Sequence, residues 1–371
     1  MDFDFSDDQQ QLRDAVAKWV DKGYTFARRR GIEKTGGFSR EAYGELAELG
    51  LTGLFVPDTH GGLGMGPIES MVVMEELGRG LVLEPLAQTL MSSVVLAGYA
   101  RSDVQAVWLP KVATGECLMV LAQQERAARY RLDGCDATAT QAQDRWALSA
   151  TKSVVPVGDR ADAFVVSAKV NGTIALFLVE RNAVGVGMHA YGTQDGGRAA
   201  EVKFVQAPAT LITLDGLTAV EHAVDVGIAS LCAEGVGVMD RMMTITADYM
   251  NTRKQFGVPI SSFQALRHRS ADMKMQLELA RSMSYYASLK LNAPAPERRA
   301  AMARAKYQLG TSMRFVGQQA VQLHGGIGVT DDYIISHYFR RLTQMEMSLG
   351  DSMHQLGQIS VAMKHTAGVF A

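Results

Sequence analysis

The sequence has few cysteines, little net charge and no long apolar run. Its 371 residues include only three cysteines, Cys117, Cys135 and Cys232, which are widely spaced and form no CxxC pair. This spacing predicts reduced thiols rather than a disulfide framework, and it predicts no metal site. The formal net charge of −2 gives no electrostatic case for binding nucleic acid or an anionic membrane surface.

Targeting signals are also missing from the pattern. No uninterrupted apolar stretch reaches the ~18 residues that a membrane span requires. The opening MDFDFSDDQQ is acidic and contains no basic segment followed by an apolar run, so no signal peptide is expected. These features together predict a cytoplasmic protein without a membrane span.

What is present is the composition of a globular chain with a large core. Hydrophobic residues make up 47% and charged residues 20% of the sequence, and the length suffices for two or three domains. The pattern changes character twice and predicts an α+β multidomain fold. We expect an N-terminal helical domain over 1–118, a middle β domain (a small barrel or sandwich) over 119–212, and a C-terminal four-helix-bundle domain over 213–371.

Local signals support this division. Ser6 is typical of a helix N-cap, and Asp7 and Asp8 follow it where the helix dipole favours acids. Asn171-Gly172 separates two alternating runs and predicts a hairpin, because both turn positions need a positive φ. Apolar periodicity predicts long C-terminal helices over 219–250, 262–291, 297–323 and 351–366.

Two short motifs carry features of anion binding. Arg253 stands at a predicted helix end, and a new helix begins near Ser261 or Ser262; a guanidinium and exposed backbone N–H groups both favour phosphate. Gly325-Gly326 follows another predicted helix and permits close backbone approach. Taken alone, each motif is more typical of an ordinary helix end, a dipole partner in the first case and a C-cap in the second.

Three segments in order carry a stronger signal: LAELGLTGLFVPDTHGGLG (46–64), TRKQFGVPISSFQALRHRSADM (252–273) and QLHGGIGVTDDYIISHYFRR (322–341). Together they resemble the acyl-CoA dehydrogenase family, and the resemblance covers essentially the whole chain. It implies a helical N-terminal domain, a β middle domain and a C-terminal four-helix bundle. It also implies bound FAD and the introduction of a trans 2,3 double bond into an acyl-CoA thioester, in which a glutamate removes the α-proton and flavin N5 takes the β-hydride.

The resemblance assigns several cofactor contacts. Arg253 is expected to hold the FAD pyrophosphate across a dimer interface, with Phe256 and Gln264 lining the same cofactor. Three further positions, Gln322, Gly325 and Gly326, match the adenine-side loop.

The predicted middle domain departs from the family pattern. Gln124-Glu125 stands where the family has a Thr-Glu pair, so Gln124 is a weaker cofactor contact, and the glycine-serine loop that follows is not recognisable. After Lys152 the family has an aromatic residue and a threonine against the flavin, whereas this chain has SVVPVGD. The resemblance therefore assigns no flavin-contacting residues with the family's pattern to this domain, apart from the weaker contact Gln124.

The catalytic position departs as well. Counting through FRRLTQMEMSLGDS places Leu349 at the glutamate position, directly before Gly350. Some relatives carry the glutamate on the helix before the RxxFG motif instead, and that position is Gly227 here, next to Ile228. Leucine and glycine accept no proton, so both known base positions are empty.

Three other carboxylates are weak candidates for a relocated base. Glu346 lies three residues before Leu349, and Asp351, which is also a doubtful cofactor contact, lies two after it. Glu234 lies seven residues beyond Gly227 on the same predicted helix face, roughly 10 Å along the axis at about 1.5 Å per residue. Each would need an altered substrate position, because a general base must reach its proton within hydrogen-bond distance.

These observations favour one interpretation over two others. The first is a subunit of an FAD-dependent acyl-CoA dehydrogenase, resembling the small, base-lacking pimeloyl-CoA dehydrogenase type, in a heterotetramer whose second chain brings the glutamate. The alternatives are a homotetramer with a relocated carboxylate and a cofactor-free structural or acyl-CoA-binding subunit. By resemblance the electron acceptor is an electron-transfer flavoprotein, and fatty, dicarboxylic and steroid side-chain acyl groups all stay open.

Overall fold

The protein folds into two compact units, each described by itself. The computed structural model describes residues 5–143 and 145–366. One unit, the helical unit, contains the described residues up to Arg30, then Pro67–Val82 and those from Ile228 onward. The other, the barrel unit, contains Gly31–Gly66 and the described part of Leu83–Gly227. The predicted boundaries 1–118, 119–212 and 213–371 divide the chain differently and stay a prediction.

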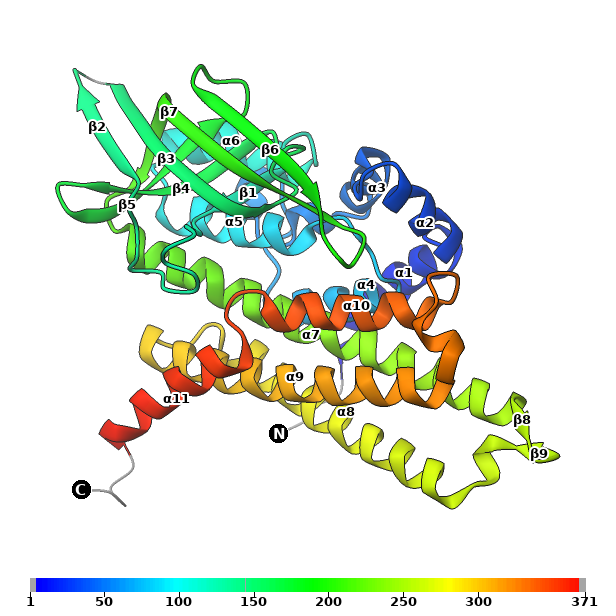
Figure 1. Ribbon diagram of the computed structural model, residues 1–371. Coiled ribbons are helices and arrows are strands. Elements are labelled where there is room, and N and C mark those ends of the chain that lie inside the picture. Colours follow the sequence, from blue (N-terminus) through cyan, green and yellow to red (C-terminus); the bar gives the residue numbers. More distant parts are fainter. Residues whose placement is uncertain (1–4, 144, 367–371) are drawn as a thin grey trace. The chain divides into compact units, whose positions relative to one another are not determined.

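Helices form most of the helical unit, with one small hairpin at the end of the longest helix (Figure 1). Two of these helices, α2 and α7, begin in one unit and end in the other. The elements are α1 (Asp7–Lys22), α2 (Phe26–Lys34), α4 (Pro67–Arg79), α7 (Gly216–Thr252), β8 (Lys254–Gln255), β9 (Val258–Pro259), α8 (Gln264–Lys290), α9 (Ala295–His324), α10 (Ile334–Met347) and α11 (Ser352–Thr366), with short 3-10 turns at Ile260–Ser262 and Gly325–Val329.

The barrel unit combines seven strands with three helices. The helices are α3 (Arg40–Glu48), α5 (Leu86–Tyr99) and α6 (Ser102–Ala113), and 3-10 turns occur at Leu51–Gly53 and Asp58–His60. The strands are β1 (Met119–Ala122), β2 (Thr138–Ala142), β3 (Arg145–Pro156), β4 (Ala163–Val170), β5 (Thr173–Glu180), β6 (Val186–Gly192) and β7 (Arg198–Thr213).

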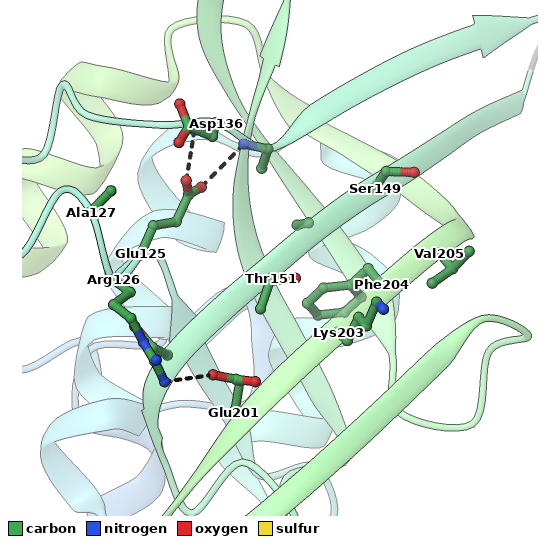
Figure 2. A pocket seen from close by; sticks show the side chains of 13 residues that line it. Glu125, Arg126, Ala127, Asp136, Ser149, Thr151, Glu201, Lys203, Phe204 and Val205 are labelled. Carbon is green, nitrogen blue, oxygen red and sulfur yellow. Dashed lines mark hydrogen bonds and ion pairs between the residues drawn. The ribbon is translucent and has the colours of Figure 1, made fainter.

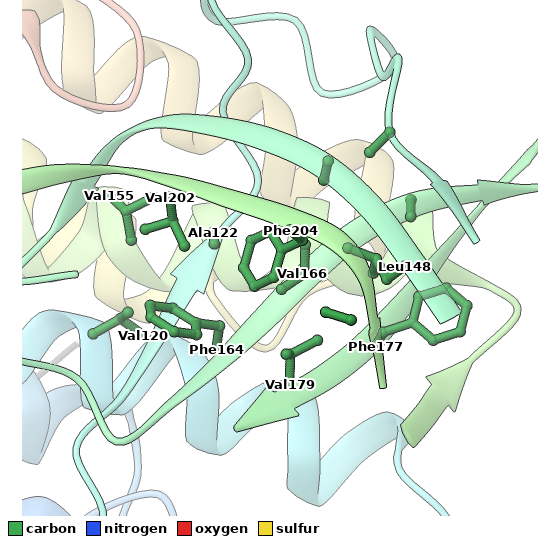
Figure 3. Close-up of a cluster of buried hydrophobic side chains, with 14 of the residues drawn as sticks. Val120, Ala122, Leu148, Val155, Phe164, Val166, Phe177, Val179, Val202 and Phe204 are labelled. Carbon is green, nitrogen blue, oxygen red and sulfur yellow. The ribbon is translucent and has the colours of Figure 1, made fainter. Parts of the chain in front are cut away.

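The strands close into a barrel. Pairings run β4–β2–β3–β7–β5 and return to β4, while β1 adds to β4 and β6 to β7. Closure leaves no edge in that ring and turns alternate side chains inward. Figure 3 shows the interior, where Leu148, Phe164, Phe177, Val202 and Phe204 are all buried. The predicted middle β domain, a small barrel or sandwich between helical segments, is confirmed as a barrel.

Several local predictions are confirmed as well. Ser6 caps α1, accepting from Gln9 N–H while the Gln9 side chain returns to the Ser6 N–H, which is a complete capping box. Asn171 and Gly172 have φ of 51° and 87° in the β4–β5 hairpin, as a primed turn requires. The three cysteines are buried and unpaired.

The four C-terminal helices predicted over 219–250, 262–291, 297–323 and 351–366 are present as α7, α8, α9 and α11, but the prediction missed a further helix. Within the described residues after Gly216 there are five, because α10 occupies Ile334–Met347. Its segment contains Ser336, His337 and paired arginines, so its polarity hid the helix. The structure places His337 and Ser336 on the buried side, which the sequence pattern alone does not reveal. Glu346 therefore belongs to the end of a helix rather than to a loop.

Helices α4 and α7 approach closely where each carries a glycine. A Cβ added at Gly78 would lie 2.1 Å from the Glu234 carbonyl oxygen, and one at Gly237 would lie 1.8 Å from the Glu75 carbonyl oxygen. Such distances leave no room for any side chain. Helix α7 is also long and apolar enough by composition to cross a membrane, but 94% of the relevant window is buried, as expected of a core helix.

Replacing Gly78 with alanine tests this contact. The added methyl group should force the two backbones apart and destabilise the helical unit by about 1–3 kcal/mol, after allowance for the ~1 kcal/mol by which alanine favours a helix. Gly357→Ala on α11 is the matched control, since its Cβ would meet nothing within 4 Å. Urea denaturation followed by circular dichroism should show a loss for the first variant and a small gain for the second; equal midpoints would contradict the close contact.

Candidate functional site

The segment that follows α7 presents charged and aromatic groups at the surface. Arg253 lies just beyond α7 and is exposed; its N–H donates to the Tyr249 carbonyl and its carbonyl accepts from Ile260 N–H, each at 2.8 Å. The hairpin β8–β9 turns at Phe256 and Gly257, with φ of 52° and 82°. The Phe256 side chain is 92% exposed. An aromatic ring held out in this way has a contact surface to offer to a ligand or another chain.

Gln264 opens the next helix. It is the first residue of α8 and is exposed, so the unbonded N–H groups of that first turn favour an anion there. Phe263, which precedes it, stands edge-to-face with Phe256 at 6.1 Å between ring centroids. The predicted combination of guanidinium and helix N-terminus is therefore present on one short stretch of chain.

An aromatic contact joins this stretch to the glycine loop after α9. The Tyr249 hydroxyl donates to the His324 carbonyl at 3.2 Å, and the two rings stack at 4.4 Å. Gly325 follows His324 directly, with φ of 64°, and it is exposed together with Gly326 and Gln322. The Tyr249–His324 contact thus joins the segment that ends at Arg253 to the loop at Gly325-Gly326, about seventy residues further along the sequence.

His324 is a member of this group that sequence reasoning missed. Its ring is buried between Tyr249 and Tyr333, and Nδ1 lies 2.8 Å from the Ala320 carbonyl. Burial lowers the pKa of His324, so the imidazole stays neutral at pH 7 and acts as an aromatic spacer. A lone histidine before two glycines gave no signal that distinguished it from a helix cap.

This surface fits the phosphate-bearing half of the FAD that the resemblance implies. It offers a guanidinium, a helix N-terminus and an exposed ring. A Cβ built at Gly325 or Gly326 meets nothing within 4 Å, so a ligand can approach that backbone. Guanidinium and backbone N–H groups are the donors that diphosphates prefer.

The loop at the base position has a defined conformation. Its residue 349 is a leucine, which has no carboxylate. Leu349 and Gly350 have φ of 55° and 99°. The Gln355 side chain donates to the Leu349 carbonyl at 3.0 Å, and Ser348 N–H donates to the Met345 carbonyl at 3.2 Å. A positive φ is uncommon for leucine. The turn is therefore imposed by these hydrogen bonds and not by the backbone preference of Leu349.

A buried lysine holds the helix end from which this loop departs. Lys306 on α9 is fully buried, and its Nζ donates to the carbonyls of Met345 and Glu346 at 3.0 and 2.9 Å. These belong to the last turn of α10, whose carbonyls lack partners within the helix. Burial lowers the pKa of Lys306 to about 8 from its ordinary 10.5. The ammonium thus substitutes for the hydrogen bonds that the next helical turn would supply.

All three carboxylates considered as relocated bases have structural partners. Glu346 is buried, not at solvent, and its Oε1 accepts from Arg314 and from Ser352 N–H, both at 3.1 Å. Asp351 caps α11 by accepting from His354 N–H at 2.8 Å. Glu234 is buried and accepts from Arg341 Nε at 2.6 Å. The alternative base position on α7 holds Gly227 and Ile228, both buried.

In the barrel unit, Glu125 forms a buried ion pair that the sequence did not reveal. Lys152 is fully buried and its Nζ donates to Glu125 Oε1 at 2.6 Å, while Glu125 also accepts from the N–H groups of Asp136 and Ala137. Burial alone would raise the pKa of Glu125, but Lys152 and these donors lower it overall. Gln124 is half-buried and accepts from Ser153 N–H through its carbonyl at 2.9 Å.

A trough lies on the outer side of the barrel beside this ion pair (Figure 2). It has a volume of about 690 Å³ and adjoins a second hollow of about 430 Å³, since Arg126, Ser153 and Glu201 line both. Gln124 and Val154 line the second hollow. Val154 has a φ of 53°, where the register of β3 against β7 slips. The predicted weak contact Gln124 therefore does face a cavity.

Known proteins match the chain along its length. The acyl-CoA dehydrogenase N-terminal domain matches residues 6–116 and the acyl-CoA dehydrogenase C-terminal domain matches 215–364. The chain is 28% identical to acyl-CoA dehydrogenase FadE27 of Mycobacterium tuberculosis, over 99% of this chain and 100% of that protein.

Two solved structures are similar throughout. One is a variant of the Tcur3481-Tcur3483 steroid ACAD, 29% identical with a TM-score of 0.90 over 97% of this chain and 98% of that one. The other is the ChsE4-ChsE5 complex from Mycobacterium tuberculosis, 27% identical with a TM-score of 0.89 over 99% and 100% of the two chains.

The buried ammonium of Lys306 predicts a pH dependence of stability. Its pKa is about 8 in the folded chain and 10.5 when exposed, so between these values the unfolded chain binds more protons. Stability should therefore rise with pH from about 8 to 10.5, by at most ~3 kcal/mol from this group. Urea midpoints measured across that range should show the rise in the wild type and a flatter profile in Lys306→Met. An equal rise in both proteins would assign the effect to other groups.

Proposed function

The chain belongs to the acyl-CoA dehydrogenase family, and we propose that it is the subunit of a heteromeric acyl-CoA dehydrogenase that completes an FAD site but carries no catalytic base. The cofactor is FAD and the substrate is an acyl-CoA thioester. The observation that carries the proposal is Leu349, an aliphatic residue at the base position, in a loop whose conformation is fixed by other contacts.

The structural partners of the other carboxylates support the same reading. If Glu346 lost its hydrogen bonds to Arg314 and Ser352, or Asp351 its hydrogen bond at the start of α11, the loop at the base position would lose the contacts that hold its conformation. Glu234 is held by Arg341. A base has to give up such partners to reach a substrate proton. These contacts weigh against the homotetramer with a relocated carboxylate.

The phosphate surface weighs against a cofactor-free subunit. Arg253 and the start of α8 would hold the FAD diphosphate, with Gly325-Gly326 beside the adenosine and Phe256 against the same cofactor. When bound, FAD supplies the acceptor for the β-hydride. In this proposal the residues of this chain bind and orient FAD. The α-proton of the substrate goes to a carboxylate of another subunit, because the Leu349 side chain accepts no proton.

Similarity to named complexes supports a heteromeric assembly. Both solved structures reported above carry names that join two different chains, and one is called a steroid ACAD. We infer a heterotetramer with a second dehydrogenase chain that has glutamate at the position of Leu349. The cytoplasmic location and an electron-transfer flavoprotein as electron acceptor belong to the same proposal. Steroid acyl thioesters are the first to try, ahead of fatty and dicarboxylic ones.

Absorption spectra test the division of labour. Under anaerobic conditions the chain purified alone should not lose its flavin absorbance, if it retains any, on addition of steroid, fatty or dicarboxylic acyl-CoA. Co-expression with a family member carrying the glutamate should give a yellow complex that one thioester bleaches. Bleaching of this chain alone would overturn the proposal, and replacing Glu346, Asp351 and Glu234 in turn would then locate the base.

Substituting Arg253 tests the cofactor contact. In the co-expressed complex, Arg253→Ala should lower the retained FAD at least about tenfold, and Arg253→Lys should restore it only in part because a lysine lacks the planar fork. Arg304→Ala is the control, since Arg304 is exposed on α9, roughly 30 Å along the helix from Gly325. Unchanged flavin content in Arg253→Ala would remove this residue from the site.

A further inference from the structure

A buried cysteine and a buried lysine are in contact inside the barrel unit. Lys152 Nζ donates to Cys135 Sγ at 3.9 Å, and both residues are buried. Cys135 comes from the loop just before β2, whereas Lys152 belongs to β3. The proposed division of labour between subunits uses neither the thiol nor the ammonium, so the chemistry of this pair is open.

Two further polar groups complete the cluster. Cys135 Sγ donates to Glu125 Oε1 at 3.4 Å, and the same oxygen accepts from Lys152 Nζ at 2.6 Å. Lys152 Nζ also donates to Ser167 Oγ at 3.0 Å. A single carboxylate oxygen therefore contacts both the thiol and the ammonium and can take a proton from either. The cluster thus holds a nucleophilic sulfur, an amine and a shared proton acceptor.

The trough described above borders this cluster. Glu125, Asp136 and Ala137 line the trough, and Cys135 directly precedes Asp136 in the chain. Figure 2 shows Glu125 and Asp136 at this wall. The carboxylate that contacts the thiol is therefore also part of the surface that a small solute in the trough meets. Hydrogen peroxide is small and neutral, so it is the oxidant that suits such an approach.

We propose that hydrogen peroxide joins Cys135 Sγ to Lys152 Nζ by a covalent S–N bond, which makes this pair a redox-sensitive cross-link. A thiol is oxidised first to a sulfenic acid, and a sulfenic acid condenses with a nearby nitrogen. Burial raises the pKa of the Cys135 thiol, so little thiolate is present at neutral pH. The reaction is therefore slow there, and its rate should rise with pH.

The first step forms the sulfenic acid. The thiol proton passes to Glu125, sulfur attacks the peroxide, the S–O bond forms and the O–O bond breaks. The departing hydroxide takes the proton from Glu125 and leaves as water. Sulfur is oxidised by two electrons and the peroxide is reduced by two, so one peroxide molecule suffices for the whole reaction.

The second step forms the cross-link without further oxidation. The Lys152 ammonium gives a proton to Glu125, and its nitrogen attacks sulfur. The N–S bond forms, the S–O bond breaks, and the released hydroxide takes a proton from the nitrogen to leave as a second water. A charged ion pair has then become a neutral sulfenamide beside a protonated Glu125, so oxidation removes both charges of the cluster.

Peptide mapping after peroxide treatment tests the cross-link. The purified chain is treated with hydrogen peroxide, unfolded, alkylated at its remaining thiols and digested with trypsin. The peptide 132–145 should be joined to 146–160 with the loss of two hydrogens, because trypsin does not cut after a modified Lys152. Dithiothreitol should restore the separate peptides. Peptides are weighed because peroxide also oxidises the 20 methionines and so changes the intact mass.

Three variants separate this pair from general oxidation. Cys135→Ser should abolish the joined peptide. Cys117→Ser is the matched control, since Cys117 is equally buried, and it should give the joined peptide in the yield of the wild type. In Lys152→Arg the amine is lost and the positive charge is kept, so Cys135 should gain oxygen without being linked. Circular dichroism of each variant verifies that it is folded before treatment.

Four outcomes would overturn the proposal. Cys135 could be oxidised to the sulfinic or sulfonic acid without a link to Lys152, or stay unmodified while the methionines are oxidised. The link could retain one oxygen atom between sulfur and nitrogen, or form in equal yield in the urea-unfolded chain. The inference goes beyond the proposed function and does not rest on it, because neither flavin content nor bleaching enters the measurement.

Discussion

The conformation of the loop at Leu349 depends on the buried ammonium of Lys306. Its hydrogen bonds to the Met345 and Glu346 carbonyls end α10 where they do, and Glu346 then reaches forward to Ser352 N–H. Burying a lysine has a large desolvation cost, which the helix-end carbonyls offset only in part, since the pKa of Lys306 is lowered to about 8. Because these contacts involve backbone atoms and neighbours, they leave the side chain at position 349 without a part in holding the turn.

That independence explains how the base position can be empty while the fold is intact. A loop held by its neighbours tolerates leucine at a positive φ, since the strain of about 1 kcal/mol is small beside the contacts that impose it. In the same unit, the hydrogen bond from the Tyr249 hydroxyl to the His324 carbonyl joins the segment that ends at Arg253 to the loop at Gly325-Gly326. Phosphate binding and proton removal are thus carried by separate pieces of structure, so one can be lost without the other.

The barrel unit follows a different logic. Lys152 and Glu125 form a buried polar group beside its apolar interior. Lys152 donates to Glu125 and to Ser167 Oγ, and Glu125 accepts from the N–H groups of Asp136 and Ala137 just before β2. Breaking such a pair leaves a buried charge, which costs several kcal/mol. The pair therefore fixes the path of the loop over 126–136, and that path in turn creates the trough on the outer side of β3 and β7.

The sequence by itself determined the order of helical and β segments, the Asn171-Gly172 turn, the Ser6 cap, and the family motifs around Arg253 and Gly325, because each depends on neighbours in the chain. Tertiary structure decided which distant groups meet. Nothing local predicts that Lys306 lies under the end of α10, that Lys152 reaches Glu125, that His324 stacks on Tyr249, or that Ser336 and His337 turn a polar segment into a buried helix face. Long-range packing sets these pairings, since a polar residue shows whether it is buried only when its partner is known.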